Sequence, residues 1–253
     1  MLFALISDIH ANVDALRSVL ADSGRAGVDQ VLCLGDLVGY NAFPRETLAL
    51  LRDHGVPSVH GNHDLMALGL LPTDGCGPIA RNAIQWTRAE LKSEDRRHLG
   101  SLPGELRPQG GMVCVHSVPG DPVVRLDRPE QFLAQAEALR TADPAVRLCF
   151  SGHTHRQGVM VVAPEGPAAR REGLELDLPR DAFCFVNPGS VGYPRGRDPR
   201  AAYALFDPDA WRISFRRVAY DRRRVLEENR RVGLQPPSAL GRLAARIGRS
   251  VPW

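Results

Sequence analysis

Several features are scarce in this sequence of 253 residues, and each scarcity excludes a class of protein. The longest apolar runs, such as residues 1–6 and 158–163, are far shorter than the roughly 20 residues of a membrane span. The first run lacks a basic start and soon reaches an aspartate, so we expect neither a signal peptide nor a membrane anchor. The five cysteines show no C-x-x-C spacing, and four of them lie in apolar, strand-like runs. We therefore expect buried, reduced thiols and a cytoplasmic protein, and not a disulfide scaffold.

Lysine is almost missing: Lys92 is the only one, so arginine supplies nearly all of the positive charge. The formal net charge is +3, but it is unevenly distributed. From Arg212 to Trp253, eleven arginines stand against three acidic residues, a local net charge of +8. A basic segment of this kind can bind nucleic acid or an anionic surface. We favour a solvated surface, because arginine is the default cation throughout this chain.

Short apolar runs alternate with helical patterns over the first 150 residues. Strands are expected at residues 2–6, 31–34, 56–59, 112–115 and 148–150, and helices at residues 44–55, 79–92, 129–140 and from Asn12 onward. This rhythm predicts a layered α/β fold with many parallel strands. After residue 156, five successive strands predict a second, largely antiparallel sheet, with a hairpin turn at residues 207–209. We expect one domain over residues 1–253, ending in a basic helical segment at about 221–253 with helices at 222–231 and 239–247.

Metal-competent side chains follow five of the expected strands directly. They are Asp8 and His10, then Asp36, then Asn62, His63 and Asp64, then His116, and finally His153 and His155. In layered α/β proteins, ligands bind at the carboxyl ends of strands. Taken singly, several of these motifs have an ordinary explanation: Gly35-Asp36 is typical of a turn, and a lone His116 is typical of a core histidine. Five such motifs in this order predict a metal site.

The ordered set D-x-H, G-D, G-N-H-D, H and G-H-x-H resembles the calcineurin-like metallophosphoesterases. Two further stretches, residues 35–40 (GDLVGY) and 187–192 (NPGSVG) followed by Pro194-Arg195, are similar to the small prokaryotic phosphodiesterase branch of that superfamily. The resemblance extends from residue 1 to about residue 207. It implies an α/β fold, a four-layer α/β/β/α sandwich of two facing mixed sheets, with a dinuclear metal centre between the sheet edges.

The resemblance also implies a role for each motif residue. One metal ion would be bound by Asp8, His10, Asp36 and His155, and the other by Asp36, Asn62, His116 and His153, with Asp36 as the bridge. This mixture of carboxylate, amide and imidazole ligands suits Mn, Fe or Zn better than Mg, and we expect Mn. His63 is the candidate general acid, and Asp64 would orient its ring.

The favoured function is metal-dependent hydrolysis of a small phosphodiester, such as a 2′,3′-cyclic nucleotide, by a metal-activated hydroxide. A phosphomonoesterase, including a protein Ser/Thr phosphatase, would use the same ligands. A nuclease and a non-catalytic, nucleic-acid-binding scaffold are less favoured, and the oligomeric state stays open. Residues 66–80 and 117–129 are the expected walls of the substrate pocket.

Two positions differ from relatives in the superfamily. Ser117 follows His116 where some relatives have glycine, and Gly39 stands where larger relatives often have aspartate.

Overall fold

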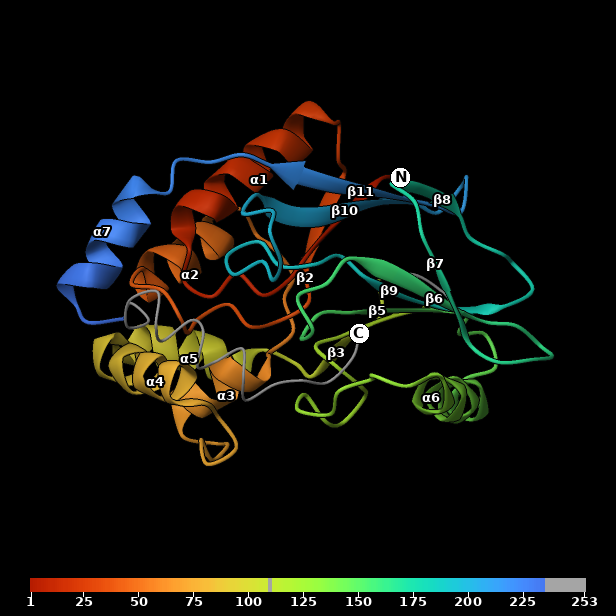
Figure 1. Cartoon of the computed structure of the whole chain (residues 1–253), viewed down its shortest axis with the longest axis horizontal. Helices are drawn as coiled ribbons and strands as arrows, with labels where there is room; N and C mark the ends of the chain where they lie inside the picture. Colours follow the sequence, from red (N-terminus) through yellow and green to blue (C-terminus); the bar gives the residue numbers. More distant parts are fainter. Residues whose placement is uncertain (109–110, 235–253) are drawn as a thin grey trace.

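Two facing β-sheets form the centre of the computed structural model, which describes residues 1–108 and 111–234 (Figure 1). The first sheet has the strand order β2 (Gln30–Cys33), β1 (Phe3–Ile6), β10 (Ala201–Asp207), β11 (Arg212–Val218) and β8 (Glu175–Asp177). The second has the order β3 (Glu105–Leu106), β4 (Met112–Val115), β5 (Leu148–Ser151), β9 (Phe183–Asn187), β6 (Gly158–Val162) and β7 (Ala169–Arg171). Both sheets are mixed, since β1–β2 and β4–β5–β9 pair in parallel and the other pairs are antiparallel.

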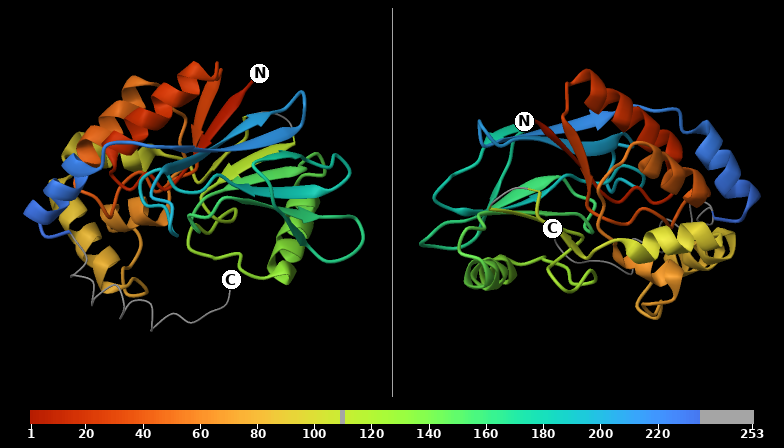
Figure 2. Two further views of the ribbon diagram at one scale, coloured as in Figure 1. Left: turned by 45° about the horizontal axis from the view of Figure 1, so that its top comes forward. Right: turned by 180° about the vertical axis from the view of Figure 1, so that it is seen from behind.

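Helices cover the outer faces of both sheets. Helices α1 (Val13–Arg25) and α2 (Pro44–Asp53) lie on the first sheet, and α6 (Pro129–Ala142) lies on the second (Figures 1 and 2). Helices α3 (Asn62–Leu68), α4 (Pro78–Glu90) and α5 (Ser93–Ser101) pack together beside the sheets, near α7 (Arg223–Arg231). The α/β/β/α sandwich predicted from the sequence is confirmed.

Alternation along the strands explains these layers. In β1, Phe3 and Leu5 belong to the apolar cluster between the two sheets, whereas Ala4 and Ile6 belong to the cluster under α1 and α2. Successive side chains of a strand point to opposite faces, so a strand buried on both faces is apolar throughout. A third cluster fills the space between the second sheet and α6.

The structure corrects two predictions about the elements and adds elements that were not predicted. Residues 56–59 form no strand but a single bridge between Cys33 and Ser58, because Pro57 has no N–H for a continuous ladder. The strands after residue 156 do not form their own sheet: β6, β7 and β9 join the second sheet, and β8, β10 and β11 join the first. Helices α3 and α5 and the short strands β3 and β7 were not predicted. The hairpin turn at 207–209 is confirmed by the β10–β11 pairing, and the helix expected at 239–247 lies outside the described residues.

The basic segment is more than a solvated surface. Arg224 forms an ion pair of 2.7 Å with Asp14, and its guanidinium lies 4.2 Å from the ring centroid of Phe43. Asn229 of α7 is buried and donates a hydrogen bond of 2.8 Å to Asn41. Helix α7 is therefore attached to the loop between β2 and α2.

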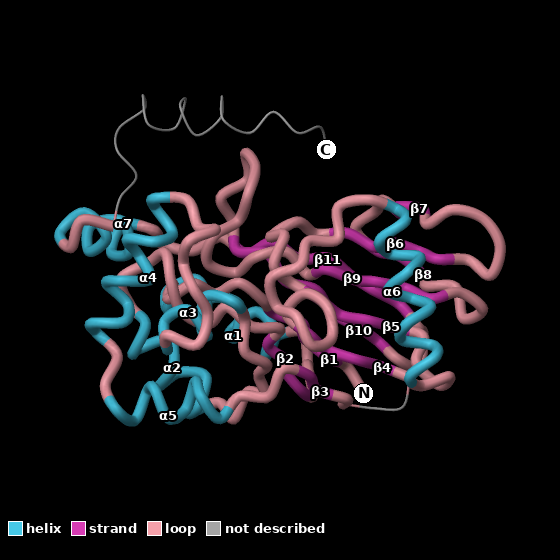
Figure 3. Tube along the Cα trace, turned by 90° about the horizontal axis from the view of Figure 1, so that it is seen from below, coloured by secondary structure: helices cyan, strands magenta, loops and turns pink. Residues whose placement is uncertain are grey.

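The loops that follow the parallel strands meet at one edge of the sandwich. Figure 3 shows the strands gathered at one end of the molecule and helices α1–α5 and α7 at the other, with loops between them. No helix of the described segments is both long enough and apolar enough to cross a bilayer.

Candidate metal centre

Six of the seven predicted metal ligands lie just beyond the ends of four strands. They are Asp8 and His10 after β1, Asp36 after β2, His116 after β4, and His153 and His155 after β5. Asn62 differs, since it is the first residue of α3 and not a residue at a strand end. All are buried except His153, which is partly exposed. The structure brings all seven together.

The first half of the cluster contains two imidazoles and two carboxylates. The Nε2 atoms of His10 and His155 lie 3.2 Å apart. Asp8 Oδ1 lies 3.3 Å from His155 Nε2, and Asp36 Oδ2 lies 3.6 Å from His10 Nε2. These four side chains are the set that the family resemblance assigned to one metal ion.

The second half is centred on Asn62. Its Oδ1 atom lies 3.0 Å from His116 Nε2 and 3.1 Å from His153 Nδ1. Asp36 Oδ2 lies 3.4 Å from His116 Nε2, so the same oxygen of Asp36 faces both halves of the cluster. The motif residues His153 and His155, two positions apart, are thus divided between the halves.

Hydrogen bonds from the ring nitrogens to the backbone prepare the site for a cation. The Nδ1 atoms of His10 and His155 donate to the carbonyls of Val38 and Tyr193, at 3.1 and 2.7 Å. Such bonds fix the tautomer in which Nε2 has a free lone pair. The two facing Nε2 lone pairs cannot hydrogen-bond each other, and the buried Asp8 Oδ1 has no hydrogen-bond partner among the described residues. A divalent cation would satisfy all three atoms.

The electrostatics of the cluster also favour cations. Burial raises the pKa of Asp8 to about 7, with a further contribution from the nearby Asp36. Burial would lower the pKa of His116, but the neighbouring Asp36 outweighs it and raises that pKa to about 9. Burial lowers the pKa values of His10 and His155 well below the ordinary value. The buried carboxylates thus draw positive charge to the cluster, in the metal-free protein as a proton on His116, and bound metal ions would supply this charge instead.

The backbone is strained at the same place. Left-handed φ angles occur at Asp8 (52°), His10 (48°), Asp36 (54°), His153 (67°) and His155 (61°). Non-glycine residues seldom adopt this conformation, and such outliers cluster at functional sites. The sharp backbone turns aim these side chains at one point.

Glycines in the motifs make room for the ligands. A Cβ atom on Gly61 would overlap the Asp36 carboxylate, and one on Gly152 would overlap the Ser7 hydroxyl and approach Asp8. Gly61 and Gly152 must therefore be glycine, because any side chain there would displace the residues of the cluster.

The sequence matches the calcineurin-like phosphoesterase superfamily domain over residues 1–210. The chain belongs to this superfamily. It is similar to a metallophosphoesterase from Sphaerobacter thermophilus of known structure, with 39% identity, a TM-score of 0.74 and coverage of 97% of this chain and 99% of that one. An uncharacterized protein of Methanocaldococcus jannaschii is 36% identical over 90% of this chain and 91% of its own length.

A hypothetical protein from Pyrococcus horikoshii shares the fold, with a TM-score of 0.73, 20% identity and coverage of 96% of both chains. The family is divalent-metal dependent, in agreement with the cluster of Asp and His side chains. The predicted family is confirmed, and with it a phosphoester hydrolase of the metallophosphoesterase class.

In this metallophosphoesterase, His63 lies beside the metal-ligand cluster. Its ring centroid is 4.7 Å from that of His10 and 4.8 Å from that of Tyr40, and its backbone N–H donates to Asp36 Oδ1 at 2.8 Å. The Nδ1 atom has no hydrogen-bond partner within the described ranges. A Cβ atom on Gly39 would lie 2.6 Å from this Nδ1, which explains why the position holds no larger residue.

Asp64 has a different contact from the one expected. Its carboxylate accepts hydrogen bonds from the backbone N–H groups of Gly61, Leu37 and Val38, at 2.8, 3.2 and 3.0 Å. In the described part of the chain, neither of its oxygens hydrogen-bonds the His63 ring. Asp64 thus joins the loop after β2 to the start of α3, and so supports Asp36 and Asn62 from behind.

Sequence reasoning missed the supporting residues of the NPGSVG stretch and a tyrosine pair. Ser190 Oγ donates to the Asp8 carbonyl at 2.8 Å, and Asn187 Nδ2 donates to the Gly152 carbonyl, so this stretch joins the loops after β1 and β5. Tyr40 and Tyr193 stack beside the cluster, with centroids 4.2 Å apart at 13°. The resemblance drew attention to both stretches, but only the fold reveals these contacts.

Proposed function

We propose that this protein is a dinuclear, metal-dependent phosphodiesterase that hydrolyses small phosphodiesters, including cyclic nucleotides such as 2′,3′-cyclic ones. The main support is the position of Asp36 Oδ2, which lies 3.6 Å from His10 Nε2 and 3.4 Å from His116 Nε2. One carboxylate between two groups of ligands fits two ions that share a bridging ligand. Family membership supplies the reaction class, and the number of ions and the diester preference are our proposals.

Each half of the cluster has the donors for one ion. Asp8, His10, Asp36 and His155 would hold the first, and Asp36, Asn62, His116 and His153 the second. The mixed oxygen and nitrogen donors favour Mn²⁺, with Fe or Zn as alternatives. When bound, two such ions would hold the phosphate oxygens and lower the pKa of a water for in-line attack.

His63 is proposed as the general acid. Its ring is buried beside the cluster, and Nδ1 has no hydrogen-bond partner among the residues described. Burial lowers the pKa of His63 in the free protein, and an anionic phosphodiester at the cluster would raise it again and favour the imidazolium. This imidazolium would then protonate the alkoxide leaving group. Asp64 contributes by holding the loop after β2 and not by contact with the ring.

The diester preference rests on space beside the metal ligands. A cavity adjoins Gly152 and Thr154, which flank His153. A diester has two ester substituents, and this cavity can receive the one that a monoester lacks.

The test is a hydrolysis screen with metal-stripped and reloaded protein. The substrates are 2′,3′-cyclic nucleotides, linear dinucleotides, bis(4-nitrophenyl) phosphate, 4-nitrophenyl phosphate and a phosphoserine peptide. We expect no turnover after chelation, best recovery with Mn²⁺, and kcat/KM at least about tenfold higher for the best diester than for the best monoester. A monoester preference would refute the diester proposal, and two-ion stoichiometry should be checked by elemental analysis.

A further inference from the structure

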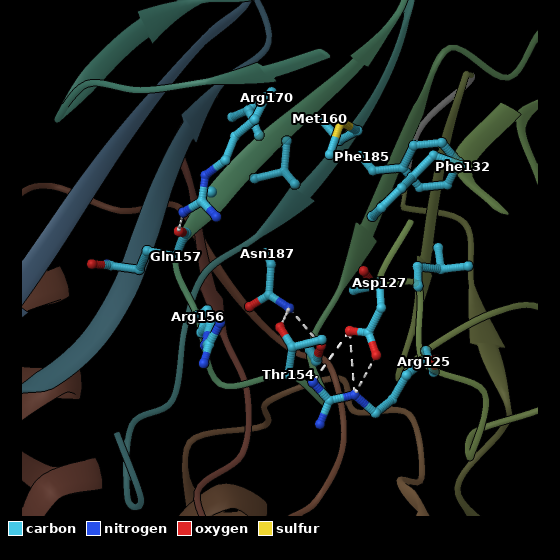
Figure 4. A pocket seen from close by; sticks show the side chains of 17 residues that line it. Arg125, Asp127, Phe132, Thr154, Arg156, Gln157, Met160, Arg170, Phe185 and Asn187 are labelled. Carbon is cyan, nitrogen blue, oxygen red and sulfur yellow. Dashed lines mark hydrogen bonds and ion pairs between the residues drawn. The ribbon is translucent and has the colours of Figure 1, made fainter. Parts of the chain in front are cut away.

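A cavity of about 120 Å³ lies next to the metal-ligand cluster, between the ends of β5, β6 and β9 and the start of α6 (Figure 4). The expected wall at residues 117–129 contributes Ser117, Arg125, Leu126 and Asp127 to its lining, whereas residues 66–80 contribute nothing to it. The cavity is not a separate site, because Ser117 directly follows His116, and Gly152 and Thr154 flank His153.

One side of the cavity is apolar and contains aromatic rings. Phe132 of α6 and Phe185 of β9 meet edge to face, with centroids 5.3 Å apart at 70°. Met160 of β6 lies beside them in the lining (Figure 4). Aromatic rings and a polarizable thioether form a surface that suits a flat π-system.

The other side is cationic. Arg125, Arg156 and Arg170 line the cavity, and Asp127 is the single acidic residue among the described residues of the lining. Arg125 forms an ion pair of 3.1 Å with Asp127, and both residues line the cavity together with Thr154 (Figure 4). Arginine presents N–H donors for ring nitrogens and carbonyl oxygens, and its planar group also stacks on aromatic rings.

The wall nearest the cluster is firmly held. Asn187 Nδ2 donates to Thr154 Oγ1 at 3.1 Å and to the Gly152 carbonyl. Ser117 Oγ donates to the Val124 carbonyl. Ser117 stands where some relatives have glycine, and its hydroxyl therefore fixes the loop that leads to Arg125.

We propose that this cavity binds the base of a nucleotide phosphodiester while the phosphate lies on the metal ligands, an inference that rests on the proposed phosphodiesterase function. An aliphatic ester group would use the apolar wall but would make no contact with the N–H donors of the arginines. A sugar alone would use the arginines but not the aromatic wall. A nucleobase, flat and apolar on its faces with polar edges, matches both sides.

Two cyclic esters that differ only in the base test this assignment. They are 2′,3′-cyclic AMP and the 2′,3′-cyclic phosphate of 1-O-methylribose, each with Mn²⁺-loaded enzyme. We expect a higher kcat/KM for the nucleotide, and a loss of about tenfold in Phe132→Ala for the nucleotide only, since stacking on one aromatic ring is of this order. The matched control is Leu133→Ala, which removes a partly buried neighbour on α6 that does not line the cavity. It should leave the ratio of the two substrates unchanged.

Arg170→Ala is a second variant in which folding is not at issue, because Arg170 lies on the exposed strand β7. It should lower kcat/KM for the nucleotide about threefold and leave the base-free ester unchanged. If the wild type hydrolyses both esters equally and Phe132→Ala slows both alike, the base assignment is wrong while the phosphodiesterase proposal stands.

If neither of these esters nor any linear diester of the screen is hydrolysed, the proposed function fails and the cavity is judged by binding alone. Saturation-transfer NMR with adenosine, guanosine, cytidine and uridine then decides. Binding to the wild type that Phe132→Ala abolishes and Leu133→Ala preserves would support a base pocket. Absence of binding by all four nucleosides would overturn it.

Discussion

Replacing His63 by alanine separates proton transfer from metal binding. The backbone N–H of residue 63 donates to Asp36 Oδ1 at 2.8 Å, and alanine keeps this bond. The side chain has no hydrogen bond through Nδ1 in the described residues, so its removal frees no buried partner on that side. The variant should therefore fold, retain both ions and lose the proposed acid.

The size of the effect should depend on the leaving group. Loss of a general acid costs about 10²–10⁴-fold, which corresponds to roughly 3–5 kcal/mol of transition-state stabilisation. We expect His63→Ala to lose this much for esters of alkyl alcohols, whose alkoxides need a proton. Esters of 4-nitrophenol should slow by less than about tenfold, since this leaving group departs as the anion and needs little help from an acid.

The assay is kcat for both ester types, with metal content by elemental analysis. Atoms of His63, His10 and Asp36 also lie within 4.8 Å of one another, so metal content is the deciding measurement. Equal slowing of both esters together with loss of metal would show that His63 is a ligand and refute the acid assignment. His60→Ala is the matched control: this half-buried histidine, two residues before Asn62, should change neither value by more than about threefold.

Asp36→Ala should lower activity more than the loss of an outer ligand such as His155, and reduce bound metal below one ion per chain; full activity in reloaded protein would contradict the bridging role. Neutralising Arg222 and Arg223 should leave cyclic-ester turnover within about threefold and oligonucleotide binding unchanged, whereas Arg224→Ala should lower the free energy of unfolding by about 1 kcal/mol through its lost ion pair and ring contact; a steep, salt-dependent loss of RNA hydrolysis would instead indicate a nuclease. Asn229→Ala should lower kcat more than it raises KM, because Asn229 holds the loop after β2, which contains Asp36, through its hydrogen bond to Asn41; unchanged kinetics would show that this hydrogen bond does not position the metal ligands. Chelation should lower Tm by several degrees, since an ion at about 100 times its Kd adds about 2.7 kcal/mol; an unchanged Tm would mean that the cluster binds no ion in the folded state.

Local rules predicted a layered α/β fold and a metal site at strand ends, whereas the four-layer sandwich and the role of each ligand came from the resemblance to the calcineurin-like metallophosphoesterases. A strand buried on both faces reads as a continuous apolar run, as in β1 and β4, and parallel strands bring their carboxyl ends to one edge. The five motifs could therefore be expected to meet before any coordinates were known.

The contacts that the sequence could not predict are made between loops. Residues 56–59 look like a strand, but Pro57 interrupts the ladder, and the chain turns at once into α3. Gly61 caps the start of that helix, and its N–H donates to the Asp64 carboxylate, which also accepts a hydrogen bond from the loop after β2. A motif residue expected to orient His63 thus proved to join two backbone segments, which no spacing rule reveals.

The strained backbone shows why these loop contacts are needed. A left-handed conformation costs an L-residue roughly 1–2 kcal/mol, and five metal-ligand residues adopt it. The summed cost, about 5–10 kcal/mol, is comparable to the whole stability of a typical domain. Hydrogen bonds between the loops oppose it: Asp8 N donates to the Gly35 carbonyl at 3.0 Å, His10 N to the Asp36 carbonyl at 2.9 Å, and Gly152 N to the His116 carbonyl at 2.9 Å.

Each bond of this kind contributes only about 1 kcal/mol net, so the bonds hold the loops in place but do not offset the strain alone. The burial of the apolar strands behind them supplies the remainder, because β1, β4 and β5 are fixed between two cores whatever their final residues do. A bound cation adds stabilisation at the point where the strain is greatest, since it is the common partner of the side chains that the strained residues present. The same backbone angles that destabilise the metal-free loops therefore orient the metal-binding side chains toward one point. Metal binding should order this edge of the sandwich more than any other part.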